Sequence, residues 1–349
     1  MADDSLTGID IVIPNWNGRH MLEICLPSLA AQSYTNFNII VVDNGSTDGS
    51  VAFLQSSYPD VQVVELPENR GFSAAVNFGI KAGTHNWVLL LNNDIEVESR
   101  CLEIMVAEIG FEPDAKMFAL KMISFHQRTM LDGAGDGVLR GGVGYRLGTM
   151  ELDSDKYNIK REVFGACGGA ALYHRSLFDE IGFFDEEFFA YLEDVDLNMR
   201  TVRAGYSCRY LPGAVVYHIG SASTGSKINK LTVKLTTRNN IYVICKNYSF
   251  GMFLRFLPAI LVYQFFWFLF VVKKGQFIAY LSGAIESFSK IFKMSSKLDQ
   301  KGCVQTLSAK EFSRRIIRSE KEVINSIMSR RNGEGKNNIL LRWYLAIFC

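Results

Sequence analysis

The sequence has no pair of cysteines in a CxxC arrangement, although seven cysteines occur among its 349 residues. Because they stand singly, a zinc site with the usual ligand spacing is not expected. Their odd number in a chain of this length also argues against a disulfide framework, and a reducing, cytoplasmic setting fits best. Residues 1–8 are acidic and lack the basic and apolar regions of a secretory signal, so none is expected.

The chain also has little net charge, because 37 Lys and Arg nearly cancel 36 Asp and Glu. Apolar residues make up 48% and charged residues 21%, which excludes a disordered or low-complexity chain. Counted along the sequence, residues 1–230 hold 18 basic and 30 acidic side chains (net −12), and residues 231–349 hold 19 and 6 (net +13). The basic half favours an anionic partner, either a membrane surface or a nucleic acid.

The first hundred residues alternate between apolar runs typical of strands and segments with helical spacing. Continuous apolar strands separated by helices predict an α/β fold, with a mostly parallel sheet that is buried on both faces. Such sheets bind ligands at the carboxyl ends of their strands, where this sequence has polar clusters at 15–17, 43–46 and 92–94. The expected strands are 9–13, 39–42, 61–64 and 87–91, and the expected helices are 20–31, 50–57 and 73–82.

Glycine dominates residues 133–148, where it fills seven of sixteen positions. This composition predicts a loop, either a mobile flap over a ligand or a plain surface excursion. Small residues between Phe164 and Tyr173 allow a backbone or a ligand to approach closely. A helix is expected to start near Glu193, and a strand, a turn and a second strand are expected between Tyr210 and His218.

The most apolar run is Phe256–Val272, seventeen residues in which only Gln264 is strongly polar. Its length is at the lower limit for crossing a bilayer, so a span, a re-entrant segment and an in-plane helix all remain open. Residues 277–292 mix aromatic and aliphatic side chains with lysines, as an interfacial amphipathic helix does, and basic residues continue through Arg318. The alternative is a buried core helix of a soluble domain.

Polar residues at three strand ends carry possible binding chemistry. Asp94 offers the oxygen ligand that Mg²⁺ and Mn²⁺ prefer, although it is also placed to cap the next helix. Asp43 offers an acceptor for the ring N–H of a nucleotide base, or it simply closes a turn. Asn69, Arg70 and Gly71 open a helix whose free N–H groups favour an anion such as phosphate.

Three carboxylates, Glu193, Asp194 and Asp196, stand within four residues beside several aromatic side chains. A carboxylate next to apolar walls and other carboxylates has its pKa raised and can act as a general base. Acidic residues also favour the first turn of a helix, so capping is the alternative. His218 closes an apolar strand and is either a metal ligand or a structural histidine.

Together these motifs resemble those of the inverting family 2 glycosyltransferases, which have the GT-A fold. The later portion is most similar to the bacterial and archaeal rhamnosyltransferase branch, which builds cell-surface polysaccharides on polyprenyl diphosphate carriers. The resemblance covers residues 9–220 and rests on segments 11–18, 42–49, 69–72, 91–94, 182–189 and 193–197 and on the strand to His218.

The resemblance implies a role for each matching residue. Asp194 would be the catalytic base with Glu193 beside it, and Asp94 and His218 would hold a divalent cation, Mg²⁺ or Mn²⁺. The metal motif reads Asn-Asn-Asp, so its first carboxylate is missing. The nucleotide-sugar site would be formed by Pro14, Asn15, Asn17, Asp43, Asn69, Arg70, Gly71, Asn77, Asn92, Asn93, Gly168 and Gly169.

The resemblance also implies the organisation and the partners of the chain. Residues 1–230 would form the catalytic domain, with a nucleotide-sugar half at about 9–110 and an acceptor half at about 111–230. Residues 231–349 would form a helical, basic region that attaches to the cytoplasmic face of the cell membrane. There the enzyme would move L-rhamnose from dTDP-L-rhamnose to a lipid-linked glycan on polyprenyl diphosphate.

Three alternatives remain open at this point. In the first alternative, the donor is a UDP-hexose or a UDP-N-acetylhexosamine and the transfer chemistry is the same. A non-catalytic sugar-nucleotide-binding component of an assembly complex is the second alternative, against which the presence of both Asp94 and Asp194 argues. A nucleic-acid binder is the third, but the apolar run favours lipid, so no nucleic-acid partner is expected.

Overall fold

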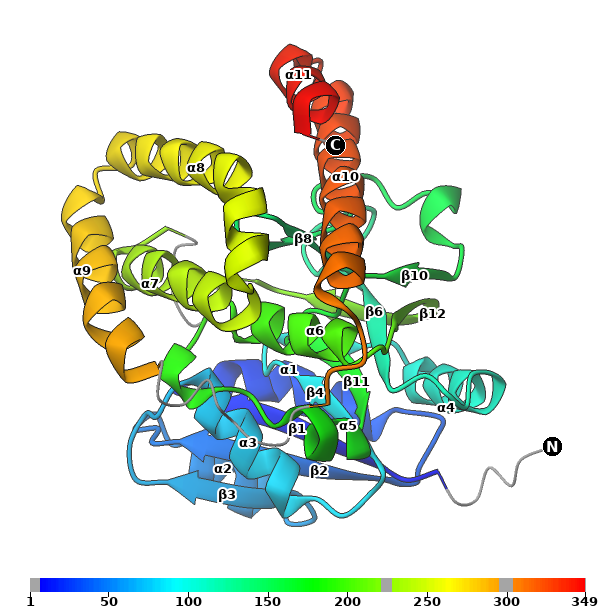
Figure 1. Cartoon of the computed structure of the whole chain (residues 1–349). Helices are drawn as coiled ribbons and strands as arrows, with labels where there is room; N and C mark the ends of the chain where they lie inside the picture. The colour runs from blue at the N-terminus through cyan, green and yellow to red at the C-terminus, as the bar shows by residue number, and fades with distance from the viewer. Residues whose placement is uncertain (1–6, 221–227, 295–303, 349) are drawn as a thin grey trace.

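A twisted, mostly parallel sheet forms the centre of the protein (Figure 1). The computed structural model describes residues 7–220, 228–294 and 304–348. The strand order is β10-β12-β6-β11-β4-β1-β2-β3, with β5 paired to β12 and β7 paired to β6. The strands are β1 (Ile9–Asn15), β2 (Phe37–Asn44), β3 (Gln62–Leu66), β4 (Trp87–Leu91), β5 (Ile95–Val97), β6 (Met117–Ser124), β7 (Leu131–Ala134), β10 (Arg161–Val163), β11 (Ala170–His174) and β12 (Cys208–His218).

The pairing brings the carboxyl ends of several strands to one edge of the sheet. Strands β1, β2, β3 and β4 run parallel to one another, whereas β11 runs antiparallel to both β4 and β6. Because β12 is parallel to β6, the ends of β4, β6 and β12 point the same way. Asp94, which follows β4, and His218, which ends β12, therefore lie at the same edge, as the sequence predicts for ligand-binding residues.

Alternating side chains of the central strands enter two separate hydrophobic cores. Val12, Ile40 and Val88 belong to one core, and their neighbours Ile11 and Leu89 belong to the other. This is the period of two expected for a sheet covered on both faces, and it confirms the α/β fold. The elements that cover the sheet include α1 (Arg19–Ala30), α2 (Ser50–Ser57), α3 (Phe72–Ala82), α4 (Cys101–Phe111), α5 (Ser176–Ile181), α6 (Glu193–Arg203) and the 3₁₀ turns η2 (Asp155–Tyr157) and η3 (Glu186–Phe188).

The glycine-rich segment 133–148 is not a loop, and this prediction is wrong. It contributes to β7 and forms β8 (Asp136–Leu139) and β9 (Val143–Arg146), which pair as an antiparallel hairpin. Its glycines allow close packing: a Cβ on Gly137 would lie 2.4 Å from Val323 Cγ2. A Cβ on Gly141 would lie 2.7 Å from Tyr263 Cβ. The strand, turn and strand expected at 210–218 are instead one strand, β12, with an irregular register between Leu211 and Val215.

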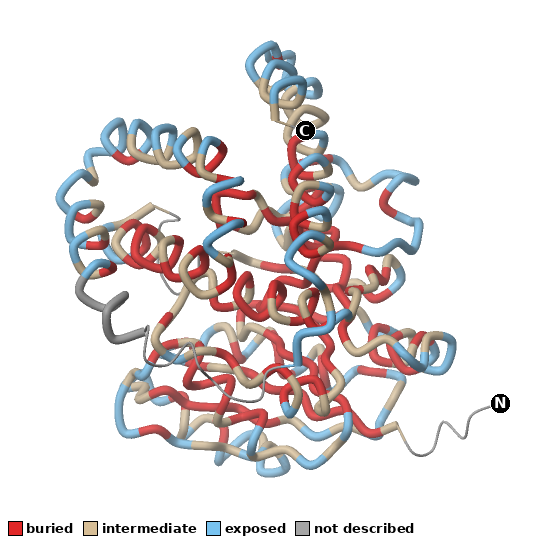
Figure 2. The backbone as a smooth tube through the Cα atoms, in the orientation of Figure 1, coloured by how far each residue is buried: buried red, intermediate tan, exposed pale blue. Residues whose placement is uncertain are grey.

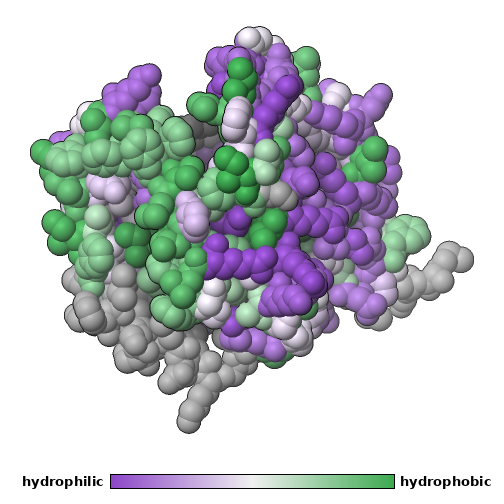
Figure 3. Space-filling model, turned by 45° about the horizontal axis from the view of Figure 1, so that its top comes forward, coloured by the Kyte–Doolittle hydropathy of each residue, from purple (hydrophilic) through white to green (hydrophobic). Residues whose placement is uncertain are grey.

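In the described parts of the chain after residue 228, five helices follow the sheet. Figure 1 shows α7, α8 and α9 gathered on one flank, while α10 runs beside β8. Buried positions are frequent along α7, whereas α8 and α9 are largely exposed on their outer side (Figure 2). Hydrophobic residues cover that outer side (Figure 3). The helices are α7 (Lys230–Asn247), α8 (Phe250–Lys273), α9 (Phe277–Met294), α10 (Ala309–Gly333) and α11 (Ile339–Phe348).

One hydrophobic cluster joins the C-terminal helices to the sheet domain, because Val138 and Val195 pack with Tyr242, Phe256 and Phe312. The basic helix α10 is amphipathic, because its apolar side chains belong to this cluster and pack on the β8–β9 hairpin. Glu320 on α10 is fully buried there and forms an ion pair with Arg140, whose backbone N–H it also accepts at 3.2 Å. A domain boundary at residue 230 stays a prediction.

Candidate active site

Polar side chains at the ends of β1, β2 and β4 form one hydrogen-bonded network. Asn15 Nδ2 donates to Asp43 Oδ1 at 3.1 Å, and Asn93 Nδ2 donates to Asn15 Oδ1 at 2.8 Å. Asn15 and Asp43 are adjacent because they are register partners at the ends of two parallel strands. Three of the residues predicted to bind the nucleotide sugar therefore lie together.

Two further predicted residues border this network. Asn17, which has a left-handed backbone with φ of 50°, accepts from the backbone N–H of Thr47 at 2.8 Å. Its own N–H donates to Ser46 Oγ at 2.9 Å. Pro14 precedes Asn15 in β1 and is paired with Val42 of β2. The chain at 14–17 is thereby fixed against the turn that follows β2.

Asn44, which the sequence reasoning missed, holds the loop before α3. Its side chain donates to Asn69 Oδ1 at 3.0 Å and to the carbonyl of Gly71 at 3.1 Å. Its oxygen accepts the Arg70 N–H at 2.9 Å. Arg70 remains half exposed and pairs with Glu186 at 3.4 Å. The loop thus presents one arginine and the start of a helix, an arrangement that favours a phosphate.

Asn77 Nδ2 donates to Glu186 Oε1 at 3.2 Å, and Glu186 in turn pairs with Arg70. Asn77 is buried in α3, where its amide also donates to the Phe184 carbonyl at 2.8 Å and accepts the Phe184 N–H at 3.1 Å. Its role as a nucleotide-sugar ligand stays a prediction.

Asp94 and His218 face each other at the other end of the site. His218 Nε2 lies 3.4 Å from Asp94 Oδ2, and His218 Nδ1 lies 2.8 Å from Asp132 Oδ2. Asp132 also forms an ion pair with Arg146. Burial alone would lower the pKa of His218, but its hydrogen bonds to Asp132 and Asp94 outweigh burial and raise this pKa.

These residues fit a divalent cation. A carboxylate oxygen and an imidazole nitrogen converge, and both are donors that Mn²⁺ accepts. The second nitrogen of His218 is bound by a carboxylate, which is the usual support for a metal-binding histidine. The cation would be held by Asp94 and His218, as the sequence predicts, with Asp132 behind the histidine.

Asp194 stands at the start of α6, directly after a constrained turn. Its Oδ2 accepts the Gly168 N–H at 3.1 Å, and its Oδ1 accepts the Val195 N–H at 2.8 Å. A Cβ on Gly168 would lie 3.3 Å from Asp194 Cβ, and Gly169 accepts the Asn92 N–H at 2.8 Å. The two glycines predicted as ligand-binding therefore connect the metal motif to the proposed base.

Glu193 is buried beside Asp194, and its Oε2 has no hydrogen-bond partner among the described residues. Burial, followed by the negative charge of Asp194, raises the pKa of Glu193 to about 8. The Glu193 carboxyl therefore favours its neutral form near neutral pH, whereas the adjacent Asp194 is partly exposed.

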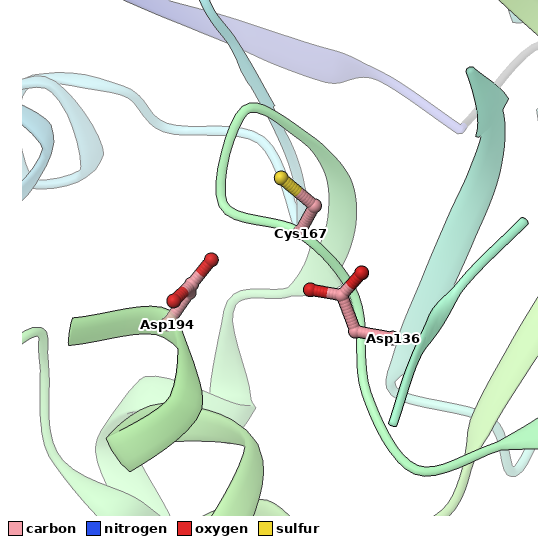
Figure 4. Close-up of side chains that lie close together, drawn as sticks. All are labelled: Asp136, Cys167 and Asp194. Carbon is pink, nitrogen blue, oxygen red and sulfur yellow. The ribbon is translucent and has the colours of Figure 1, made fainter. Parts of the chain in front are cut away.

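Asp136 and Cys167, which the sequence reasoning also missed, approach Asp194 from two other elements (Figure 4). The ligand atoms of the three residues lie within 4.8 Å of one another. Burial and the charge of Asp194 raise the pKa of Asp136 to about 7, and burial raises that of Cys167 to about 12. A neutral thiol is a poor ligand for Mg²⁺ or Mn²⁺, so Asp94 and His218 fit such a cation better.

Three of the missed residues share a cause. Asp136 and Arg146 lie within the glycine-rich segment 133–148, for which the sequence predicts a loop, and Asp132 directly precedes it in β7. Their only sequence signal is the presence of charged residues within an otherwise small and apolar segment.

Comparison with known proteins adds the family. Residues 10–182 match the domain described as Glycosyl transferase family 2. Over 230 residues the chain is 30% identical to an N-acetylglucosaminyl-diphospho-decaprenol L-rhamnosyltransferase of Mycobacterium tuberculosis, covering 60% of this chain and 74% of that protein. It is 29% identical over 195 residues to a PGL/p-HBAD biosynthesis glycosyltransferase of Mycobacterium bovis, covering 54% and 68%.

Solved structures confirm the expected fold. The crystal structure of S. aureus TarS in complex with UDP superposes with a TM-score of 0.50 at 16% identity, covering 92% of this chain and 81% of that one. The complex with UDP-GlcNAc gives a TM-score of 0.50 at 17% identity, covering 91% and 81%.

Proposed function

Because the chain belongs to glycosyl transferase family 2, we propose that it is an inverting glycosyltransferase in which Asp194 is the catalytic base. The observation that supports this most is the placement of Asp194. Two backbone N–H groups hold it beside Glu193 and Asp136, whose pKa values are both raised, and Gly168 and Gly169 link it to the metal motif.

In the proposed reaction, Asp194 removes the proton of an acceptor hydroxyl while that oxygen attacks the anomeric carbon. The bond from this carbon to the nucleoside diphosphate breaks, its electron pair stays on the diphosphate, and the configuration inverts. A bound divalent cation would supply positive charge that stabilises the departing diphosphate. Asp94 and His218 would hold it, and Arg70 and the start of α3 would add donors for the phosphates.

The donor and acceptor are proposed from the named relative, a rhamnosyltransferase that acts on a decaprenol-linked sugar. L-rhamnose from dTDP-L-rhamnose is the favoured donor sugar, with Asp43 accepting the ring N–H of the base. The acceptor would be a glycan on polyprenyl diphosphate, and the product would serve cell-surface polysaccharide synthesis.

The proposed acceptor places the enzyme at a membrane, and the exposed apolar surface of α8 and α9 supports this. Of the described helices, α8 is the one that is long and apolar enough to cross a bilayer. Its exposed side chains are joined by those of α9, giving one continuous hydrophobic face (Figure 3). This face comprises Leu261, Phe265, Phe266, Leu269, Phe270, Phe277, Ile278, Leu281, Ile285 and Phe288.

We assign α8 an in-plane position, not a span. Its other side is fastened to α7, because Gln264 donates to Asn240 and Trp267 Nε1 donates to Thr237 Oγ1 at 3.0 Å. Spanning would leave these polar groups in hydrocarbon without their partners, which is costly. The exposed Lys273 and Lys274 at the end of α8 suit anionic headgroups. The described cysteines are free thiols, which suits the cytoplasmic face.

The deciding experiment is a donor screen with mass detection of the product, using a short-chain lipid diphosphate N-acetylglucosamine as acceptor. Rhamnose transfer from dTDP-L-rhamnose, lowered about 10²–10⁴-fold in Asp194→Asn, supports the proposal. If transfer occurs only from UDP-hexose or UDP-N-acetylhexosamine, the proposed reaction stands and the assignment of the donor is wrong. Unchanged transfer by Asp194→Asn would refute the assigned base.

A further inference from the structure

The turn before Asp194 is the most constrained backbone near the proposed active site. Phe189, Tyr191 and Leu192 have φ values of 63°, 71° and 68°, which is the left-handed region that residues with side chains rarely occupy. Such residues carry backbone strain, so surrounding contacts must hold the turn in place. The next residues, Glu193 and Asp194, begin α6.

One side chain from the C-terminal region supplies much of that hold. Asn239 of α7 is fully buried, and its Nδ2 lies 2.9, 2.8 and 2.7 Å from the carbonyl oxygens of Phe188, Ala190 and Tyr191. An amide has two N–H donors, so the three acceptors share them. The remaining carbonyl of the turn, that of Phe189, accepts the Ser73 N–H at 3.2 Å. All four consecutive carbonyls from 188 to 191 are therefore bound.

The neighbouring residue Arg238 strengthens this contact. It donates to the carbonyl of Phe188 at 2.8 Å and, through its Nε, to Asn239 Oδ1 at 2.9 Å, which fixes the orientation of the amide. Arg238 in turn pairs with Glu286 of α9 at 2.6 Å. The contacts thus run from α9, through α7, to the turn that carries the proposed base.

We propose that Asn239 is a positioning residue, which sets the location of the Asp194 carboxylate by holding the carbonyls of the preceding turn. This inference rests on the proposed function of Asp194. Asn239 reaches the turn across 48 residues of sequence, and it touches none of the groups proposed to bind donor or cation. Its loss should therefore lower turnover more than it weakens nucleotide binding.

Asn240 provides a matched control on the same helix. It is also buried, and it donates to the carbonyl of Gly141 at 2.6 Å on the hairpin, not to the turn. Asn239→Ala and Asn240→Ala each remove one buried amide from α7. Asn239→Asp keeps the shape and removes the donors, and Asn239→Gln keeps the donors on a longer side chain.

The test uses the full chain and begins with hydrogen–deuterium exchange, which requires no substrate. Peptides covering 187–195 should exchange faster in Asn239→Ala and Asn239→Asp than in Asn240→Ala, with Asn239→Gln between them and the unchanged protein. Equal exchange in the Asn239 and Asn240 variants would overturn the proposal. A destabilised variant is recognised because exchange then rises throughout the sheet, and such uniform change in the Asn239 variants also counts against a positioning role.

Turnover supplies the second measurement. With dTDP-L-rhamnose and the lipid diphosphate acceptor, kcat should fall about 100-fold in Asn239→Asp, while the donor KM changes less than about threefold. Recovery of part of the lost kcat in Asn239→Gln is also expected. A loss shared equally by Asn240→Ala, or a rise in KM with kcat unchanged, would overturn the proposal. If Asp194→Asn itself keeps full activity, the proposed base is wrong, and exchange at 187–195 still decides whether Asn239 holds the turn.

Discussion

His218 Nδ1 lies 2.8 Å from Asp132 Oδ2, and this contact turns the other ring nitrogen toward Asp94. The histidine at the end of β12 is therefore oriented by β7, a strand of the same large sheet, and not by its own strand. Asp132 contacts both His218 and Arg146, and it therefore links the proposed cation site to Arg146.

Asp132→Asn should weaken binding of Mn²⁺ by about 10–100-fold, because the carboxylate that orients and polarises His218 is lost. Calorimetric titration of the full chain with MnCl₂ in the presence of dTDP measures the affinity directly. Asp153→Asn, which removes a carboxylate from the Lys121 ion pair instead, is the control. Equal Mn²⁺ affinity in Asp132→Asn and the unchanged protein would show that the histidine needs no such support.

Glu193→Gln should stabilise the protein more as the pH rises. Burial and the Asp194 charge raise the pKa of Glu193 from 4.5 to about 8 in the folded state. Between these values the folded protein binds more protons than the unfolded chain, so the stability of the unchanged protein falls as the pH increases. Because glutamine does not titrate, the melting temperature of the Glu193→Gln variant, relative to that of the unchanged protein, should rise from pH 5.5 to pH 8.5.

The exposed Glu65 on β3 provides the comparison for this titration. Glu65→Gln makes the same chemical substitution at an exposed side chain and is measured over the same pH range. A Glu193→Gln melting profile parallel to that of the unchanged protein would contradict a raised pKa in the fold.

The double variant Phe265→Ser, Phe266→Ser should lose at least about tenfold of its affinity for vesicles, because two exposed aromatic rings would no longer enter lipid. Co-sedimentation with mixed phosphatidylcholine and phosphatidylglycerol vesicles measures the bound fraction. Phe111→Ser on α4 alters a ring that is 78% exposed and lies outside this face, so it should bind as before. Retention of the double variant at the unchanged level would remove the assigned membrane face.

Glu320→Gln should destabilise the fold by about 3–5 kcal/mol, because it removes the buried carboxylate that pairs with the buried Arg140 guanidinium. Glu311→Gln breaks an exposed pair with Arg314 on the same helix and should cost at most about 1 kcal/mol. Urea unfolding followed by circular dichroism compares the two. Similar midpoints for both variants would mean that the buried pair adds little to stability.

The sequence was most informative where the local pattern decides the structure. Runs such as 39–42 and 87–91 are continuously apolar, so their strands, and the polar residues Asp43 and Asp94 that follow, could be predicted. The predicted start of a helix near Glu193 is also confirmed, since α6 begins at that residue. These predictions need only the chain on either side of each residue.

The parts that could not be predicted depend on partners that are distant in sequence. Gly137 in β8 lies against Val323 of α10, and Gly141 in the hairpin turn lies against Tyr263 of α8, whereas glycine disfavours strands when judged locally. Asp132 meets His218 across 86 residues, and Asn239 meets Tyr191 across 48. No spacing within a short segment encodes either contact.

The close packing of α10 on the β8–β9 hairpin also orders events during synthesis. The hairpin that carries Asp136 is covered only after the ribosome has released the chain through α10, which ends at Gly333. Helices α8 and α9 precede α10 in the chain, so they emerge before the fold around Asp136 is complete. A nascent chain therefore exposes the apolar faces of α8 and α9 before it can be catalytically competent.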